Sequence, residues 1–162
     1  MISSVHVANS ILRKFELNNK NITPLRLYCL VYLIYSNYLY NNVILFDETF
    51  IMEDGIPKLP HLWYKFECYK DKPIKTYALN AIEDIVYISD DNNDFNLCLD
   101  EMFIKYIDYS DKDLLKYIRS EGNLINNYPD GEMLNFCDIL DDEIKRHEKI
   151  LVKAKKFKDK LK

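Results

Sequence analysis

Residues 24–40 constrain the fold more than any other part of this sequence, because they read as a helix that is apolar almost all round. Thr23 is a good N-cap, and Pro24 occupies the first helical position, where a missing backbone N–H costs nothing. Apolar and aromatic residues then fill nearly every position of residues 25–35. A helix without a polar face is buried on most sides, so we expect this segment to form the centre of the molecule.

Helical spacing of apolar residues on both sides of this segment predicts a mainly α fold of the α+β class. Such stripes occur before Asn18, after Ser110, and in residues 61–69, 99–107 and 133–162. We expect about six helices around the central buried helix, with a small two- or three-stranded β element formed by the β-prone runs 43–46 and 49–52. Residues 78–88 suit either a helix or a strand.

The charge of the chain is unevenly distributed. Its 162 residues are enough for one domain with a core of its own, and their formal net charge is only −4. Residues 145–162, however, hold nine basic and two acidic residues, a local charge of +7, so the other 144 residues carry −11. We therefore expect an acidic body followed by a basic C-terminal tail.

Cysteine spacing and hydropathy indicate in which cellular compartment the protein lies. The four cysteines lie far apart and form no CxxC pair, so neither a disulfide framework nor a zinc site is expected. No apolar run reaches the roughly 20 residues that cross a bilayer, and residues 1–4 do not resemble the start of a signal peptide. These features predict a reduced, cytoplasmic protein that does not enter a membrane.

Three short motifs follow one another in the first half of the chain. Residues 22–27 read Ile-Thr-Pro-Leu-Arg-Leu, residues 45–46 read Leu-Phe, and residues 55–66 read Gly-Ile-Pro-Lys-Leu-Pro-His-Leu-Trp-Tyr-Lys-Phe. This order resembles the Panacea (SocA-like) antitoxin family, which typically has T-P-L-K-L, a short L-F and G-P-V-x-P-x-x-Y-x-x-F. The resemblance divides the chain into an antitoxin-like domain, residues 1–125, and a C-terminal helical extension with the basic tail, residues 126–162.

The resemblance implies a non-enzymatic protein that neutralises a partner toxin by direct protein–protein binding. It also implies, for some members, a role as an adaptor to a Clp-type protease, and a gene in a prophage or mobile element beside a small toxin gene. Two alternatives stay open. One is an anti-CRISPR-like inhibitor of a host defence nuclease, encoded by a phage or mobile element on the same scaffold. The other is a small DNA-binding regulator, whose affinity for DNA would fall steeply with salt.

The sequence shows no arrangement typical of an active site, so we expect no catalytic residue, bound metal or cofactor. The three histidines are scattered, and Cys29 lies in the most apolar helix, where a thiol stays protonated. Residues 90–101 place oxygen-bearing side chains at several positions of an EF-hand loop, but Phe95 stands where that loop needs glycine. An acidic turn that caps a helix is the simpler interpretation of these residues.

Contacts with a partner are expected at aromatic and basic side chains. Trp63 and Tyr64 follow the turn at residues 55–60; core packing is favoured for Trp63 and partner contact for Tyr64. Lys149, Lys153 and Lys156 of the tail either hold an acidic partner surface, bind nucleic-acid phosphates, or form a solvated helix end. Binding of nucleic acid is not expected outside this tail, because the acidic body repels phosphate groups. The oligomeric state stays open.

Overall fold

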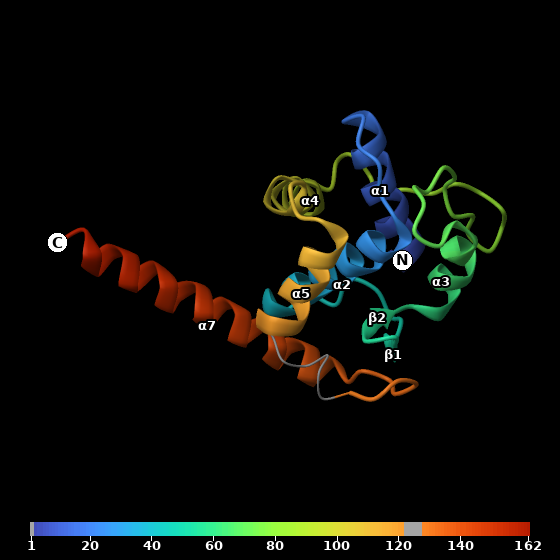
Figure 1. The fold of residues 1–162 in the computed structure, drawn as a ribbon. Coiled ribbons are helices and arrows are strands. Elements are labelled where there is room, and N and C mark those ends of the chain that lie inside the picture. The colour runs from blue at the N-terminus through green and yellow to red at the C-terminus, as the bar shows by residue number, and fades with distance from the viewer. Residues whose placement is uncertain (1, 122–127) are drawn as a thin grey trace.

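The computed structural model describes residues 2–121 and 128–162, and it is mainly helical with a small antiparallel sheet (Figure 1). This confirms the predicted fold class and the expected number of about six helices for the described residues. The helices are α1 (Ser4–Leu17), α2 (Pro24–Tyr40), α3 (Pro60–Phe66), α4 (Asn93–Tyr106), α5 (Asp111–Glu121) and α7 (Phe136–Lys160). A short 3-10 turn (Glu67–Tyr69) follows α3, and the sheet pairs β1 (Ile51–Glu53) with β2 (Ile56–Lys58).

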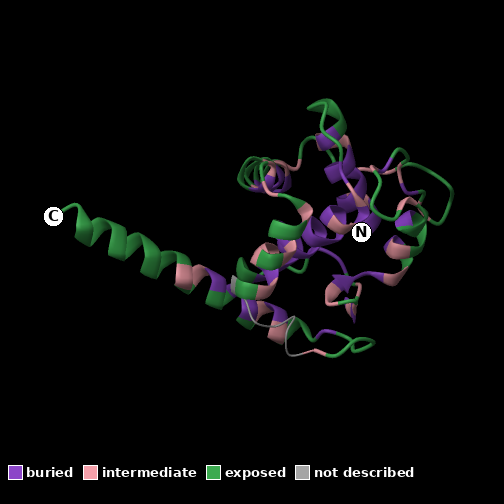
Figure 2. Cartoon of the chain, viewed as in Figure 1, coloured by how far each residue is buried: buried purple, intermediate pink, exposed green. Residues whose placement is uncertain are grey.

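Helix α2 lies at the centre of the molecule, as its sequence predicts. It contacts α1, α4, α5, α7 and β2, and most of its residues are buried (Figure 2). The Thr23 hydroxyl accepts a hydrogen bond from the backbone N–H of Arg26, so the predicted cap is present. The buried Arg26 then donates through Nε to Asp111 at the start of α5, 2.9 Å away. Because Asp111 is in the first turn of α5, its charge also suits the dipole of that helix.

The predicted positions of the strands are only partly right: the run 49–52 overlaps β1, but the run 43–46 and the turn at residues 47–48 are wrong. The hairpin turns at Asp54 and Gly55, whose φ angles of 55° and 68° lie in the left-handed region that two-residue hairpin turns require. The strands therefore flank this turn rather than residues 47–48, and residues 43–46 form no strand. Residues far along the chain complete the pairing of β1: the Met52 N–H donates to the Glu132 carbonyl, 2.9 Å away.

Residues 78–88 form neither a helix nor a regular strand. A single isolated bridge joins Leu79 and Ile85, and Glu83 has a φ of 64°. The segment is held instead by Asn9, a buried residue of α1 whose side chain bonds both the N–H and the carbonyl of Ala78, each at 2.9 Å. A buried amide thus satisfies the backbone that a strand partner would otherwise satisfy.

Side chains cap α4 and α5 as expected. The Asn92 side chain accepts from the Phe95 N–H at 3.1 Å, and the Ser110 hydroxyl accepts from the Asp113 N–H at 3.1 Å. The residues that resemble an EF-hand therefore form a capped helix start. Within the described parts of the chain, no group of histidine, cysteine, aspartate or glutamate is arranged to hold a metal ion.

Helix α7 is 25 residues long and has two different halves. Its first half packs on α2, whereas its second half projects from the body (Figure 1). The expected domain boundary at residues 125 and 126 lies outside the described residues. Helix α7 begins after that boundary and still contributes buried residues to the body (Figure 2). None of the described helices is both long and apolar enough to cross a membrane.

Candidate functional site

The histidines lie in packing contacts with neighbouring side chains. His147 stacks on the Tyr40 ring with centroids 3.9 Å apart, and its Nε2 lies 3.2 Å from a Glu143 carboxylate oxygen. His61 lies 2.8 Å from the Ser4 hydroxyl and 3.3 Å from Glu48. These arrangements join separate elements of the fold, which is the packing role expected of His147.

The thiols of the core are not activated. Burial, the largest cause, raises the pKa of Cys29 to about 12, and burial with nearby carboxylates does the same for Cys98. Thiols with such a pKa are protonated at neutral pH and are poor nucleophiles. Cys68 and Cys137 are exposed, and neither pairs with another cysteine.

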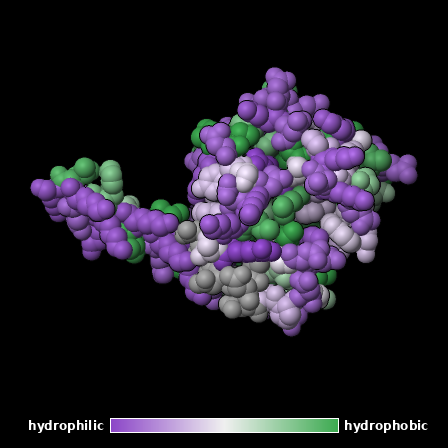
Figure 3. All heavy atoms as spheres, viewed as in Figure 1, coloured by the Kyte–Doolittle hydropathy of each residue, from purple (hydrophilic) through white to green (hydrophobic). Residues whose placement is uncertain are grey.

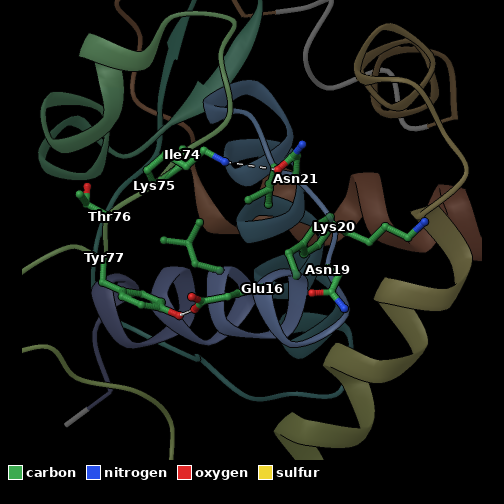
Figure 4. A pocket seen from close by; sticks show the side chains of 11 residues that line it. Glu16, Asn19, Lys20, Asn21, Ile74, Lys75, Thr76 and Tyr77 are labelled. Atoms are coloured by element: carbon green, nitrogen blue, oxygen red, sulfur yellow. Dashed lines mark hydrogen bonds between the residues drawn. The ribbon is translucent and has the colours of Figure 1, made fainter.

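A polar groove of about 340 Å³ lies where the end of α1 meets residues 19–22 and 74–77. Figure 4 shows its two hydrogen bonds: Tyr77 donates to Glu16 across one end, and Lys75 donates to Asn21 at the other. Burial and the Glu16 carboxylate raise the pKa of Tyr77, so its hydroxyl stays protonated. Two charged side chains of the lining, Glu16 and Lys75, already bond uncharged neighbours, and no cysteine or histidine lies among the lining residues.

Helix α3 presents one aromatic side chain to solvent. Leu62 and Phe66, four residues apart, are buried and fix which face of this short helix points inward. Tyr64 lies on the other face and is 66% exposed. Trp63 is half-buried, and the buried Lys58 ammonium lies 4.7 Å from its ring centroid. The structure thus places Tyr64 in solvent and Trp63 partly in the core, in line with the preferences inferred from sequence.

A loop beside α3 adds three exposed aliphatic side chains to this surface. Lys65 donates to the Leu79 carbonyl at 2.7 Å, which joins the start of this loop to the helix. Asn80 accepts from the N–H groups of Ile82 and Asp84, which fixes a local turn in the loop. We call the resulting surface the α3 face; it consists of Tyr64, Leu79, Ile82 and Ile85.

A buried ionic cluster fixes the first half of α7. The Arg146 guanidinium is 2% exposed and lies 2.7 Å from Asp142 and 2.9 Å from Glu143. Burial alone would lower the pKa of Arg146, but Tyr32 and the two carboxylates raise it above its ordinary value. From α2, the Tyr32 hydroxyl donates to Asp142 at 3.1 Å and Ser36 donates to Glu143 at 3.0 Å. These bonds satisfy the buried charges, as their burial requires.

Residues 150–162, which are the second half of α7 and the two residues after it, are exposed at every position, and we call them the arm. Figure 3 shows apolar side chains on the arm among hydrophilic ones. Its apolar stripe consists of Ile150, Ala154, Phe157 and Leu161, spaced i, i+4, i+7 and i+11, which places them on one side of the helix. Sequence periodicity located part of this stripe, but it did not show that nothing in the described chain covers it.

The five predicted partner residues fall on two separate surfaces. Trp63 and Tyr64 belong to α3, with ring centroids 5.3 Å apart. Lys153 and Lys156 are exposed on the arm, which extends away from α3 (Figure 1), while Lys149 donates to the Ser120 carbonyl at 3.0 Å. Sequence reasoning missed the buried cluster of α7, although its i+3 and i+4 spacing is typical of ion pairs on a helix.

The chain matches no protein-family model, no curated protein and no solved structure. Its functional interpretation therefore rests on the residue motifs and on the two surfaces described above.

Proposed function

We propose that this chain is an antitoxin-type protein that neutralises a toxin by binding it directly through the α3 face. The observation that carries the proposal is the exposure of Tyr64 on α3, next in sequence to Lys65, which bonds a loop with three exposed aliphatic side chains. Exposed apolar surface of this kind marks protein-interaction sites more often than isolated apolar side chains do.

The construction of the α3 face suits a protein partner. Tyrosine supplies a large apolar ring and a hydroxyl at little cost in side-chain entropy, so it is a frequent anchor of interfaces. Leu62 and Phe66 fix the orientation of α3 from below, and the Lys65–Leu79 hydrogen bond fixes the loop, so the face is ordered before a partner arrives. A preordered surface loses less conformational freedom on binding than a mobile one.

The motif residues support this assignment by shaping the scaffold. Thr23 caps α2, Arg26 joins α2 to α5, and Gly55 turns the hairpin that leads to α3. Among the residues that resemble the antitoxin family, Gly55 thus bears on the position of α3, and Thr23 and Arg26 bear on that of α2. In this proposal the chain acts as a binding protein, and the buried thiols and histidines serve its stability.

The function is tested by expressing the product of the gene beside this one with and without the chain. We expect the neighbouring product to arrest growth, the chain to restore growth, and the two proteins to copurify. The Tyr64→Ala variant should weaken binding by about 2 kcal/mol, roughly thirtyfold in Kd, because an interface anchor is lost. Isothermal titration calorimetry measures this change.

A matched pair of variants tests whether the α3 face is the contact surface, independently of whether the chain is an antitoxin. Ile82→Asp should abolish binding, whereas Ile44→Asp, at an exposed isoleucine in the segment after α2, should leave it intact. If both variants bind like the wild type, the α3 face is not the contact surface. If the wild-type chain neither binds nor protects against any neighbouring product, the antitoxin assignment itself is wrong.

A further inference from the structure

The face of α7 that packs on the body continues into the arm, where no described residue of the chain covers it. Ile139 and Arg146 on this face are buried, and further along the same side Phe157 and Leu161 are 65% and 72% exposed. Three helical turns have little stability of their own in water unless an apolar face is packed. This uncovered stripe therefore indicates a docking element.

The charge of the arm restricts what can cover it. Residues 150–162 contain six lysines and one aspartate, a local charge of +5. Lys153 and Lys160, seven residues apart, flank the row formed by Ile150 and Phe157 on the same side of the helix. Two arms packed on each other would bring these lysines together, which disfavours arm–arm pairing. The stripe needs an apolar surface bordered by acidic groups.

The outer face of α4 has this complementary pattern. Leu97 and Ile104, seven residues apart, are 61% and 75% exposed. Two exposed acidic residues with the same spacing, Asp94 and Glu101, run beside them, and the exposed Asp108 follows in the turn after the helix. The lysine of this helix, Lys105, lies over the Tyr106 and Tyr117 rings, 5.1 and 5.4 Å from their centroids.

The dimensions of the two elements also agree. Helix α4 has 14 residues, which gives a length of about 21 Å, and the helical part of the arm is about 16 Å long. The arm leaves the body as a straight continuation of the anchored first half of α7, so it does not fold back onto the α4 of its own chain. In Figure 1 both elements lie on the same side of the body.

We propose that the arm of one copy packs across α4 of a second copy, and that the reciprocal contact closes a two-fold dimer. The apolar stripe, centred on Phe157, covers Leu97 and Ile104, and the lysine row of the arm faces the acidic row of α4. A contact of this isologous kind uses the same two surfaces on both subunits and therefore closes. In this dimer the basic tail of each copy binds the acidic body of the other. The dimer does not depend on the function proposed for the α3 face.

Light scattering coupled to size-exclusion chromatography tests the dimer with the full-length chain. At about 100 µM, a concentration at which a contact of micromolar affinity is nearly saturated, we expect twice the mass of the chain. Phe157→Asp on the arm and Ile104→Lys on α4 should each give the monomer mass. Ile82→Asp, at an exposed isoleucine of the α3 face and outside both surfaces, is the control and should remain a dimer. Circular dichroism verifies that each variant is folded.

Charge reversal distinguishes the arm–α4 contact from other arrangements. Lys153→Glu with Lys160→Glu should give a monomer, as should Glu101→Lys with Asp108→Lys. All four substitutions in one chain should restore the dimer, because the rows are again opposite in sign. A dimer that survives reversal of α4 alone, or a wild-type chain that is monomeric at every concentration, overturns the proposal. So does a monomer whose arm binds duplex DNA with a steep salt dependence.

Discussion

Arg146 shows how a single buried charge sets the orientation of a whole helix. Two carboxylates of α7 lie at hydrogen-bond distance from it, and two hydroxyls of α2 donate to those carboxylates. Replacing it by methionine strands Asp142 and Glu143 in the interior without a cation. We expect Arg146→Met to lower the free energy of unfolding by about 3 to 5 kcal/mol, because an uncompensated buried charge is costly. Urea denaturation followed by circular dichroism measures the loss.

The control for this prediction removes the charges together. A chain with Asp142→Asn, Glu143→Gln and Arg146→Met keeps side chains of similar size and has no buried ion. Its free energy of unfolding should recover most of the loss seen in the single variant. If the single variant unfolds at the same urea concentration as the wild type, the cluster does not anchor α7.

The buried thiols predict an alkaline dependence of stability. In the folded chain the pKa of Cys29 and of Cys98 is about 12, whereas in the unfolded chain both thiols have ordinary values near 9. Between these values the unfolded state has lost protons that the folded state still binds, so stability falls as pH rises. Urea denaturation at pH 8 and at pH 10 should therefore show a smaller free energy of unfolding at pH 10.

Thiol labelling gives an independent measurement of the same burial. In native protein at pH 8, a disulfide reagent should label Cys68 and Cys137 rapidly and leave the two core thiols unreacted. In denaturant all four should react. The dependence on pH should weaken in Cys29→Ala, and an unchanged slope in that variant would assign the effect to other groups.

At the scale of elements, the two halves of α7 should respond differently to truncation. At a protein concentration too low for the dimer, a chain that ends at Lys149 loses only exposed residues, so its Tm should stay close to that of the full chain. A chain that ends at Ile144 loses Arg146 and leaves Asp142 and Glu143 unpaired inside the body. Its stability should fall by several kcal/mol, about the cost of breaking a buried ion pair. Equal melting temperatures for the two truncated chains would contradict this division of α7.

Elements that depend on local residues were predictable from the sequence, and those that depend on distant contacts were not. The start of α2 follows from Thr23 and Pro24, and the starts of α4 and α5 follow from Asn92 and Ser110. The strands were misplaced because their pairing depends on the turn at Gly55 and on residues more than 75 positions later. The irregular path of residues 78–88 depends on Asn9, whose role appears only when α1 is packed beside them.

At the scale of the whole molecule, the sequence predicted the architecture better than the surfaces. An apolar central segment and several amphipathic ones were enough to specify a mainly helical body around α2. The exposure of Tyr64 followed from the spacing of Leu62 and Phe66, but the aliphatic side chains that join it come from a separate loop. The excess of lysine beyond residue 145 was visible, whereas the burial of Arg146 within it required the fold.

The contacts between α2 and α7 can form only after α7 has been synthesised. Tyr32 and Ser36 leave the ribosome 110 and 107 residues before the carboxylates that bind them. Domains begin to fold from the N-terminal side while translation continues, so the polar side of α2 stays open to water during most of that time. Only a chain translated past residue 146 can close the body. A prematurely terminated product would leave Tyr32 and Ser36 of α2 exposed to water. Proteases would recognise such a product as unfolded.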